Sequence, residues 1–151
     1  MSPTYPWTGK KNSGITALLW LLNDSNDLGI SFDSSTGFTL PNGAVYSPDA
    51  SWVSNEKWDA LTQQQREEEF SPLAPDFVVE LPSSSDSLKK LQEKMAEYIE
   101  NGVRLGWLID PKNKTVEISQ QGKEVKILES PQTVSGEDVL PGFELNLNKI
   151  W

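Results

Sequence analysis

One short run, Phe77-Val78-Val79-Glu80-Leu81, constrains the fold of this chain more than any other, because it is apolar except at its fourth residue. A continuous apolar run of this length is typical of a central strand that is buried on both faces of a sheet. Burying an ionised carboxylate costs several kcal/mol unless a partner compensates its charge. Glu80 therefore predicts a metal ion or a lysine beside this strand, or else a side chain that caps backbone where the chain surfaces at Pro82.

The segments after this strand predict a strand, helix, strand arrangement. Ser85 or Asp86 can cap a helix that runs to about Asn101 and ends at a glycine. Residues 103–110 have the pattern of a second buried strand, and residues 115–128 that of a hairpin at the far edge of the sheet. A long helix between two buried strands is typical of an α/β fold.

The front of the chain is less regular. Residues 1–14 contain two prolines and two glycines among polar residues, which predicts an irregular segment, and residues 15–23 suit a largely buried helix. Residues 29–53 read as an antiparallel meander with a tight turn at Pro41-Asn42-Gly43, and residues 54–70 as one or two short helices. We therefore expect a single domain over residues 1–151, with a mixed β-sheet flanked by helices.

Composition limits the chemistry. The chain has no cysteine and no histidine, which excludes disulfides, zinc sites with these ligands and histidine-based triads, so any metal must be held by oxygen ligands. The net charge of −9 argues against nonspecific nucleic-acid binding, although bound divalent cations would supply the positive charge that a phosphodiester needs. No apolar run is long enough to span a membrane and no signal pattern opens the chain, so we expect a cytoplasmic protein.

Asp49 is the first residue that could join Glu80. It follows Pro48 within the predicted strand 44–53, so the two carboxylates would converge if their strands pair. Paired carboxylates bind magnesium well. The alternative is an ordinary turn, because Pro-Asp is common in turns and occurs again at Pro75-Asp76.

Lys94 is the second residue that could join Glu80. In the helix after Glu80, it lies about 60° from Leu91 at the edge of the apolar stripe, which directs it toward the sheet. Tyr98 follows one turn later on the same side, so both side chains could reach the end of the Glu80 strand. The alternative is a lysine that extends along the apolar surface beside a core tyrosine.

Longer strings carry a resemblance to a known family. They are Ser47-Pro48-Asp49, Pro75 to Glu80, Ser85-Asp86 with Lys94 and Tyr98, Phe32 to Phe38, Leu40 to Gly43, Gly102 to Pro111, and Leu140 to Phe143. Over nearly its whole length the chain resembles the bacterial Uma-two family, which belongs to the PD-(D/E)XK superfamily. The resemblance implies a restriction-endonuclease-like fold and an endonuclease that hydrolyses phosphodiester bonds of DNA.

The resemblance also implies roles for these residues. Asp49 and Glu80 would hold a divalent ion, Mg²⁺ or Mn²⁺, that activates water for attack on the phosphodiester. The superfamily lysine usually stands two residues after the glutamate, where this chain has Pro82. In this family the lysine moves to the following helix, which matches Lys94, and Tyr98 would position it.

Two functions stay open. Similar proteins begin with further elements that carry another acidic residue, so we expect a member shortened at the N-terminus. The first function is a DNA endonuclease dependent on magnesium or manganese, and the second is a catalytically inactive binding or assembly module that could form a homodimer. Trp7 and Trp52 could stack on bases, but scattered tryptophans more often anchor strands in cores, so neither joins the predicted site.

Overall fold

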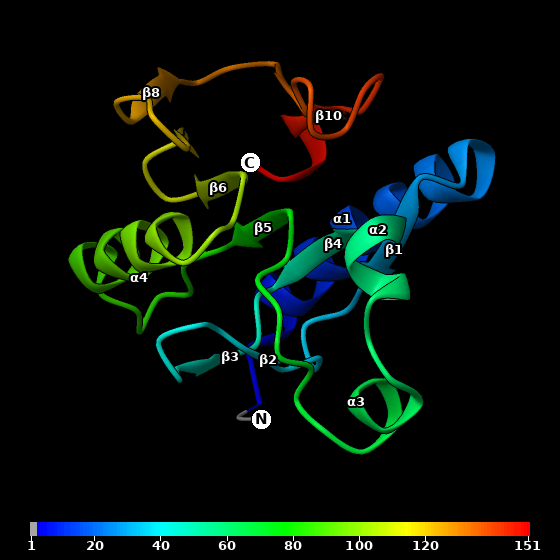
Figure 1. Ribbon diagram of the computed structural model, residues 1–151. Coiled ribbons are helices and arrows are strands. Elements are labelled where there is room, and N and C mark those ends of the chain that lie inside the picture. Colours follow the sequence, from blue (N-terminus) through cyan, green and yellow to red (C-terminus); the bar gives the residue numbers. More distant parts are fainter. Residues whose placement is uncertain (1–2) are drawn as a thin grey trace.

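The computed structural model describes residues 3–151, and its centre is a six-stranded sheet in the order β1-β4-β5-β6-β7-β8 (Figure 1). These strands are β1 (Gly29–Phe32), β4 (Ala50–Ser54), β5 (Phe77–Glu80), β6 (Leu105–Asp110), β7 (Thr115–Gln120) and β8 (Lys126–Glu129). β5 and β6 are parallel and are connected by helix α4 (Leu88–Glu100), whereas the other neighbours in this sheet are antiparallel. The predicted α/β fold with a mixed sheet flanked by helices is confirmed.

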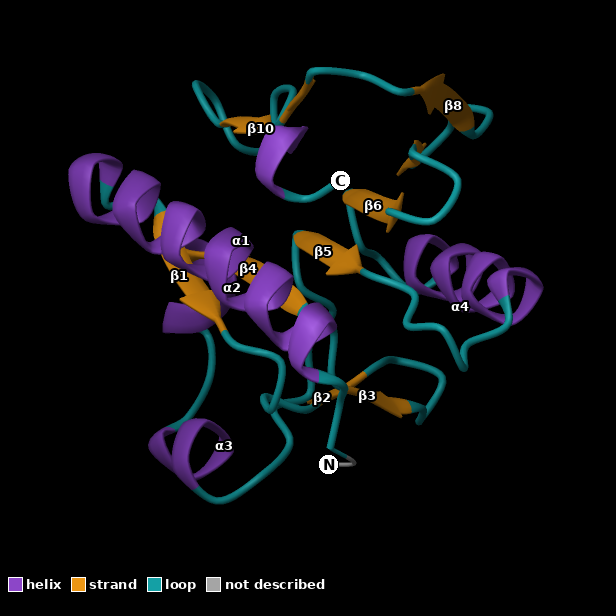
Figure 2. Cartoon of the chain, turned by 180° about the vertical axis from the view of Figure 1, so that it is seen from behind, coloured by secondary structure: helices purple, strands orange, loops and turns teal. Residues whose placement is uncertain are grey.

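The remaining elements cover the two faces of this sheet. They are α1 (Pro6–Asn26), α2 (Asn55–Asp59), α3 (Gln63–Glu67), the hairpin of β2 (Phe38–Thr39) and β3 (Val45–Tyr46), the hairpin of β9 (Thr133–Ser135) and β10 (Glu144–Asn146), and the 3-10 helix η1 (Leu147–Lys149). α1 and the segment from β9 to η1 pack on one face, and α4 with the β2–β3 hairpin packs on the other (Figure 2). Within residues 3–151, no helix has the length and apolar character needed to cross a membrane.

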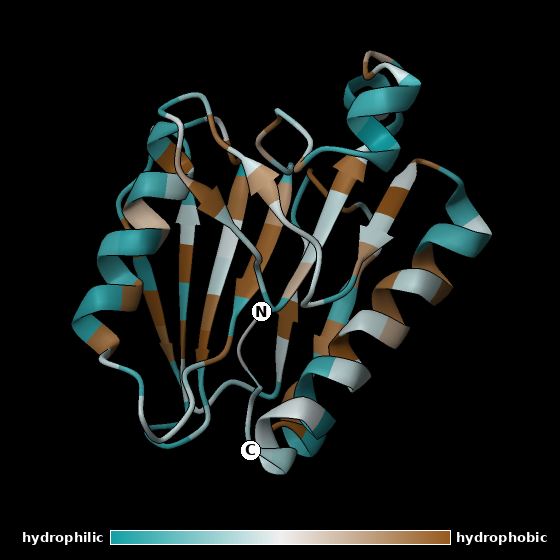
Figure 3. Cartoon of the chain, turned by 90° about the horizontal axis from the view of Figure 1, so that it is seen from below, coloured by the Kyte–Doolittle hydropathy of each residue, from teal (hydrophilic) through white to brown (hydrophobic). Residues whose placement is uncertain are grey.

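Alternation along β5 decides which layer each of its side chains meets. Phe77 and Val79 join the core on the α1 side, whereas Val78 packs with Met95 of α4. Glu80 is two residues after Val78 and therefore points to the α4 side. Gly106 on β6 leaves room for the Met95 side chain of α4, because a Cβ there would overlap the sulfur of Met95. Figure 3 shows hydrophobic residues concentrated along the strands between the two layers of helices.

α1 corrects the expectation that residues 1–14 are irregular, since the helix begins at Pro6. Residues 1 and 2 of that range lie outside the described residues. Proline is tolerated in the first turn of a helix because the N–H that it lacks would have no partner there. The helix also runs on to Asn26, and its middle is less buried than predicted. Leu19 is fully buried, whereas Trp20 is 61% exposed.

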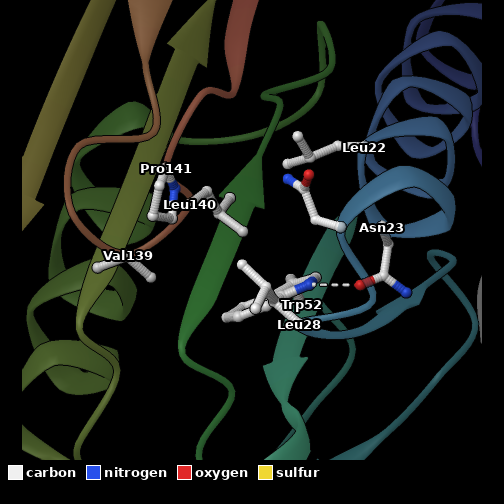
Figure 4. Close-up of a pocket in the computed structure, with 8 residues that line it drawn as sticks. Leu22, Asn23, Leu28, Trp52, Val139, Leu140 and Pro141 are labelled. Carbon is white, nitrogen blue, oxygen red and sulfur yellow. Dashed lines mark hydrogen bonds between the residues drawn. The ribbon is translucent and has the colours of Figure 1, made fainter.

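The C-terminal end of α1 is fixed to β4, as the close-up in Figure 4 shows. Asn23 Oδ1 accepts hydrogen bonds from Trp52 Nε1 at 3.3 Å and from the Gly29 amide at 3.0 Å. Trp52 is 4% exposed, so its predicted place in the core is confirmed. Leu22 and Leu140 line the same small pocket. This anchor holds α1 across the sheet and brings its N-terminal half toward the start of β4.

The expected meander over residues 29–53 is wrong. β1 pairs directly with β4, and β2 and β3 form a separate two-stranded hairpin. The turn at Pro41-Asn42-Gly43 is where we predicted it, with its glycine at φ 90°. Pro48 has no N–H for the ladder and interrupts the predicted strand 44–53, so that strand is divided into β3 and β4.

The cap of α4 also differs in detail from the prediction. Ser87 is the N-cap, and its Oγ accepts a hydrogen bond from the Lys90 amide at 3.4 Å. Asp86 instead closes the preceding turn by accepting a hydrogen bond from the Ser83 amide at 2.8 Å. The short helices α2 and α3, and the edge hairpin of β7 and β8, lie where the sequence predicted them.

Candidate active site at the end of β5

The pairing of β4 with β5 brings Asp49 beside Glu80. The two strands are antiparallel with Ala50 opposite Val79, so Asp49, just before β4, lies next to Glu80, the last residue of β5. Both carboxylates line a cleft of about 250 Å³ whose walls also include Lys94. The structure therefore brings the three predicted residues together, and their roles stay a prediction.

Lys94 compensates the charge of Glu80. Its Nζ lies 2.9 Å from Glu80 Oε1, and the Tyr98 hydroxyl donates a hydrogen bond to the same oxygen at 2.9 Å. The ammonium also lies 4.9 Å from the ring centre of Tyr46 and 5.7 Å from that of Tyr98, within range of cation–π attraction. Tyr46 is itself held by a 2.6 Å hydrogen bond to Glu97. Two aromatic rings thus fix the direction of the lysine.

Asp49 is held from two sides. Its Oδ2 accepts a hydrogen bond from the Leu81 amide at 2.6 Å, and its Oδ1 accepts one from Asn12 Nδ2 at 3.2 Å. Leu81 follows β5 directly, whereas Asn12 belongs to α1. Asp49 therefore connects the sheet to α1, which lies on the face opposite α4. The cleft therefore lies where both helical layers reach the end of β5.

Burial controls the ionisation of the site. It raises the pKa of Glu80 to about 7, while Lys94 acts to lower that pKa and Asp49 to raise it. Burial also raises the pKa of Asp49, against the effect of the Leu81 amide and Lys94. The pKa of Tyr98 is raised by burial and by the charge of Glu80, so its hydroxyl remains a hydrogen-bond donor. Buried Glu80 and partly buried Asp49 lie near one ammonium, that of Lys94, which leaves an excess of negative charge that a cation could neutralise.

The donors present fit a small divalent ion. Among residues 3–151, no group of three or more His, Cys, Asp or Glu comes together, so carboxylates alone would supply two ligands. Asn12 also lines the cleft, and its Oδ1 is buried and has no hydrogen-bond partner within the described chain. Oxygen donors of this kind suit Mg²⁺ or Mn²⁺, which keep several waters. When bound, such an ion would lower the pKa of coordinated water and polarise a phosphodiester.

The chain matches the model of one known family. The family model Uma2, described as "Putative restriction endonuclease", matches residues 1–148. This chain belongs to the Uma2 family. The predicted family is thereby confirmed, and its description indicates a nuclease.

Solved structures support the fold of this Uma2 protein. A crystal structure described as a putative nuclease belonging to DUF820, from Anabaena variabilis, has a TM-score of 0.80 at 19% identity, over 99% of this chain and 82% of that one. At this identity the likeness shows a shared fold. A DrdV–DNA complex has a lower TM-score of 0.44 at 16% identity, over 76% of this chain and 10% of that one. No curated protein matches the chain.

Asn12 is the residue of the Uma2 site that sequence reasoning missed. It falls in the segment that we expected to be irregular, so its side chain had no predicted direction. A signal was present, because Asn12, Ile15 and Leu19 have the spacing of one helical face. All three side chains are buried on the face of α1 that meets the sheet. Extending the predicted helix by one turn would have found it.

We had expected Trp7 to anchor the core of this Uma2 protein, but it does not. It is 61% exposed in the first turn of α1, and Lys10 Nζ and Lys11 Nζ lie 5.0 and 4.7 Å from its ring centre. The first turn of α1 has little sheet beneath it, since its buried residues begin at Lys11. Trp7 therefore contacts side chains of its own helix and is otherwise exposed to solvent.

The second Pro-Asp pair has a structural role. Asp76 is 1% exposed, and its Oδ2 accepts a hydrogen bond from the Ser54 amide at 2.6 Å. Its Oδ1 lies 3.3 Å from Arg104 and 3.5 Å from Lys57. Asp76 precedes β5, whereas Asp49 is beside its far end. The same dipeptide thus holds the sheet together at one position and lines the cleft at the other.

Proposed function

We propose that this Uma2 protein is a metal-dependent endonuclease that hydrolyses phosphodiester bonds of DNA. Asp49 and Glu80 hold the divalent ion, Mg²⁺ or Mn²⁺, and Lys94 orients the attacking water and offsets charge on the phosphate. The observation that carries the proposal is the convergence of two carboxylates, buried Glu80 and partly buried Asp49, in one cleft with an ammonium 2.9 Å from Glu80. The family description supports the same reaction class.

The residues around these three preorganise the cleft. Tyr46 and Tyr98 restrict the long side chain of Lys94, so little freedom is lost when it acts on a phosphate. The Leu81 amide fixes one oxygen of Asp49 and keeps that carboxylate beside Glu80. Such groups hold the charge distribution before the substrate arrives, which is the main source of electrostatic catalysis.

Plasmid nicking tests this proposal. The unaltered chain should convert supercoiled plasmid to the open form with Mg²⁺ or Mn²⁺ and should lose this activity in EDTA. Asp49→Asn should abolish nicking and metal binding together, because the neutral amide binds divalent ions weakly. Glu129→Gln, on the exposed face of β8, removes the same charge away from the cleft and should leave the rate unchanged. EDTA-resistant nicking, or full activity in Asp49→Asn, would instead identify a contaminating nuclease.

Metal affinity should depend steeply on pH below neutrality. With the pKa of Glu80 raised to about 7, the carboxylate must lose a proton before it can bind a cation. The affinity for Mn²⁺ should therefore fall about tenfold for each pH unit below 7 and level off above it. Calorimetric titrations at pH 5.5, 6.5, 7.5 and 8.5 measure this profile. An affinity that stays constant across this range contradicts the assigned ligand.

A second candidate function is an inactive assembly module that forms a homodimer. It is favoured by the outer face of α1, where Leu18, Trp20 and Leu21 are 42%, 61% and 62% exposed and no charge lies among residues 15–22. An uncharged apolar helix face is complementary to its own copy. Sedimentation should then show a dimer that Trp20→Glu converts to monomer, with Val125→Glu on the far hairpin as control. Absence of Mn²⁺ binding at millimolar concentration would favour this module over the nuclease.

A further inference from the structure

We infer that Asn12 of α1 is the third protein ligand of the metal site, giving its Oδ1 to the ion that Asp49 and Glu80 hold. This inference rests on the proposed function, because it assumes that the cleft binds a divalent cation. It adds an uncharged oxygen from the layer opposite α4 to a site otherwise formed by the ends of two strands.

The first argument is the unpaired oxygen. Asn12 is 6% exposed, and its Nδ2 donates a hydrogen bond to Asp49 Oδ1 at 3.2 Å. Its Oδ1 is buried and has no hydrogen-bond partner among residues 3–151. Buried amide oxygens are nearly always paired, and one that is not requires an explanation, such as an ion or water that binds there. Asn12, Asp49 and Glu80 line the same cleft, so an ion held by both carboxylates would lie next to Asn12.

The second argument is the surrounding helix. Ile15 and Leu19, the other residues of this buried face toward its C-terminal end, are apolar and fully buried. An apolar side chain at position 12 would continue that face without desolvating an amide. A buried asparagine at the turn that reaches the cleft is therefore costly for packing and is explained by the site.

The third argument concerns charge and ligand number. Mg²⁺ and Mn²⁺ take about six oxygen ligands, and the two carboxylates leave most positions to waters. Carbonyl oxygens, including those of amides, suit such ions as well as carboxylates do. Asp49, Glu80 and Asp86 already line the cleft with the single ammonium of Lys94, so a further carboxylate at position 12 would add to an excess of negative charge. An amide supplies the ligand without that repulsion, and its Nδ2 can continue to hold Asp49.

The competing explanation is that Asn12 only positions Asp49 through Nδ2. Counting the waters on a bound ion separates the two roles. Tb³⁺ can replace Mg²⁺ or Mn²⁺ at oxygen sites, and the difference between its luminescence lifetimes in H₂O and D₂O reports the number of coordinated waters. Loss of a protein ligand admits an extra water, whereas loss of a positioning hydrogen bond does not.

The experiment compares Asn12→Ala and Asn12→Asp with the unaltered chain, using Tb³⁺ lifetimes and Mn²⁺ calorimetry at pH 8. Asn12→Ala should bind one more water per Tb³⁺ and should bind Mn²⁺ at least about tenfold more weakly. Asn12→Asp keeps an oxygen at the same place but loses the Nδ2 donor, so it should keep the original water count and bind Mn²⁺ as tightly or more tightly. Ser13→Ala, at the exposed neighbouring position, is the matched control.

Circular dichroism of the metal-free proteins verifies that each variant folds, and Asn12→Asp serves as the test if Asn12→Ala does not. An unchanged water count in Asn12→Ala, or weaker Mn²⁺ binding by Asn12→Asp than by the unaltered chain, overturns the inference and assigns Asn12 to positioning. Failure of the unaltered chain to bind Tb³⁺ and Mn²⁺ overturns the proposed function as well. The two failures are thus distinguishable.

Discussion

Lys94→Ala is expected to lower the rate of plasmid nicking by about 10²–10³-fold, the usual cost of removing one preorganised group that stabilises transition-state charge. The ammonium lies 2.9 Å from Glu80 and lines the cleft, so both a water and a phosphate there would be within its field. Lys94→Arg keeps the charge but changes its shape and reach, and should recover only part of the rate. Lys126→Ala on β8 removes a lysine from an exposed edge strand and should retain full activity.

The nicking assay for this prediction should be run above pH 8. Lys94 acts to lower the pKa of Glu80, so its removal raises that pKa further and protonates the carboxylate near neutrality. At higher pH the carboxylate is ionised in both proteins, and Mn²⁺ calorimetry can show whether metal binding survives. A lost rate with retained binding places Lys94 in the chemical step. Equal nicking by Lys94→Ala and the unaltered chain would remove it from the mechanism.

Asp76→Ala is expected to lower the free energy of unfolding by about 3 kcal/mol. The substitution leaves the Ser54 amide without its 2.6 Å acceptor and leaves Arg104 and Lys57 without their shared carboxylate. These contacts join the end of β4, the start of β5 and the segment before β6, so their loss loosens the centre of the sheet. The midpoint of urea unfolding measures the change.

Asp59→Ala is the matched control for this second prediction. The side chain of Asp59 is 77% exposed and lies 4.0 Å from Arg66, a surface pair whose removal costs less than about 1 kcal/mol. A loss of stability in Asp76→Ala no larger than in Asp59→Ala would show that the buried carboxylate contributes little. Asp76→Asn retains an acceptor for the Ser54 amide and should lie between the two.

The sequence predicted the elements that follow a clear period. β5, α4, β6 and the β7–β8 hairpin all have a continuous, helical or alternating apolar pattern, and each lies within a few residues of its expected position. Lys94 was placed correctly because the direction of a helical side chain follows from its angle to the apolar stripe. The sequence pattern was sufficient to predict the direction of a side chain wherever that direction depends only on its own helix or strand.

What the sequence left open or missed has a tertiary cause. Asp49 and Asp76 follow prolines in the same way, and only the pairing of β4 with β5 gives one to the cleft and the other to the base of the sheet. The first turns of α1 carry proline and glycine, which suggest a loop, but packing of Ile15 and Leu19 on the sheet compensates for weak helix propensity. Asn12 was missed for this reason.

Gly106 extends the influence of the fold on the chemistry beyond the cleft. It lies on β6 beneath Met95, and the absence of a side chain there leaves room for the Met95 sulfur between α4 and the sheet. Lys94 is the neighbour of Met95, so the separation of helix and sheet also sets how far the ammonium must reach to Glu80. Gly106 lies outside the cleft. A larger residue there would displace Met95 and with it Lys94, and would change the distance between the ammonium and Glu80 without altering any residue that lines the cleft.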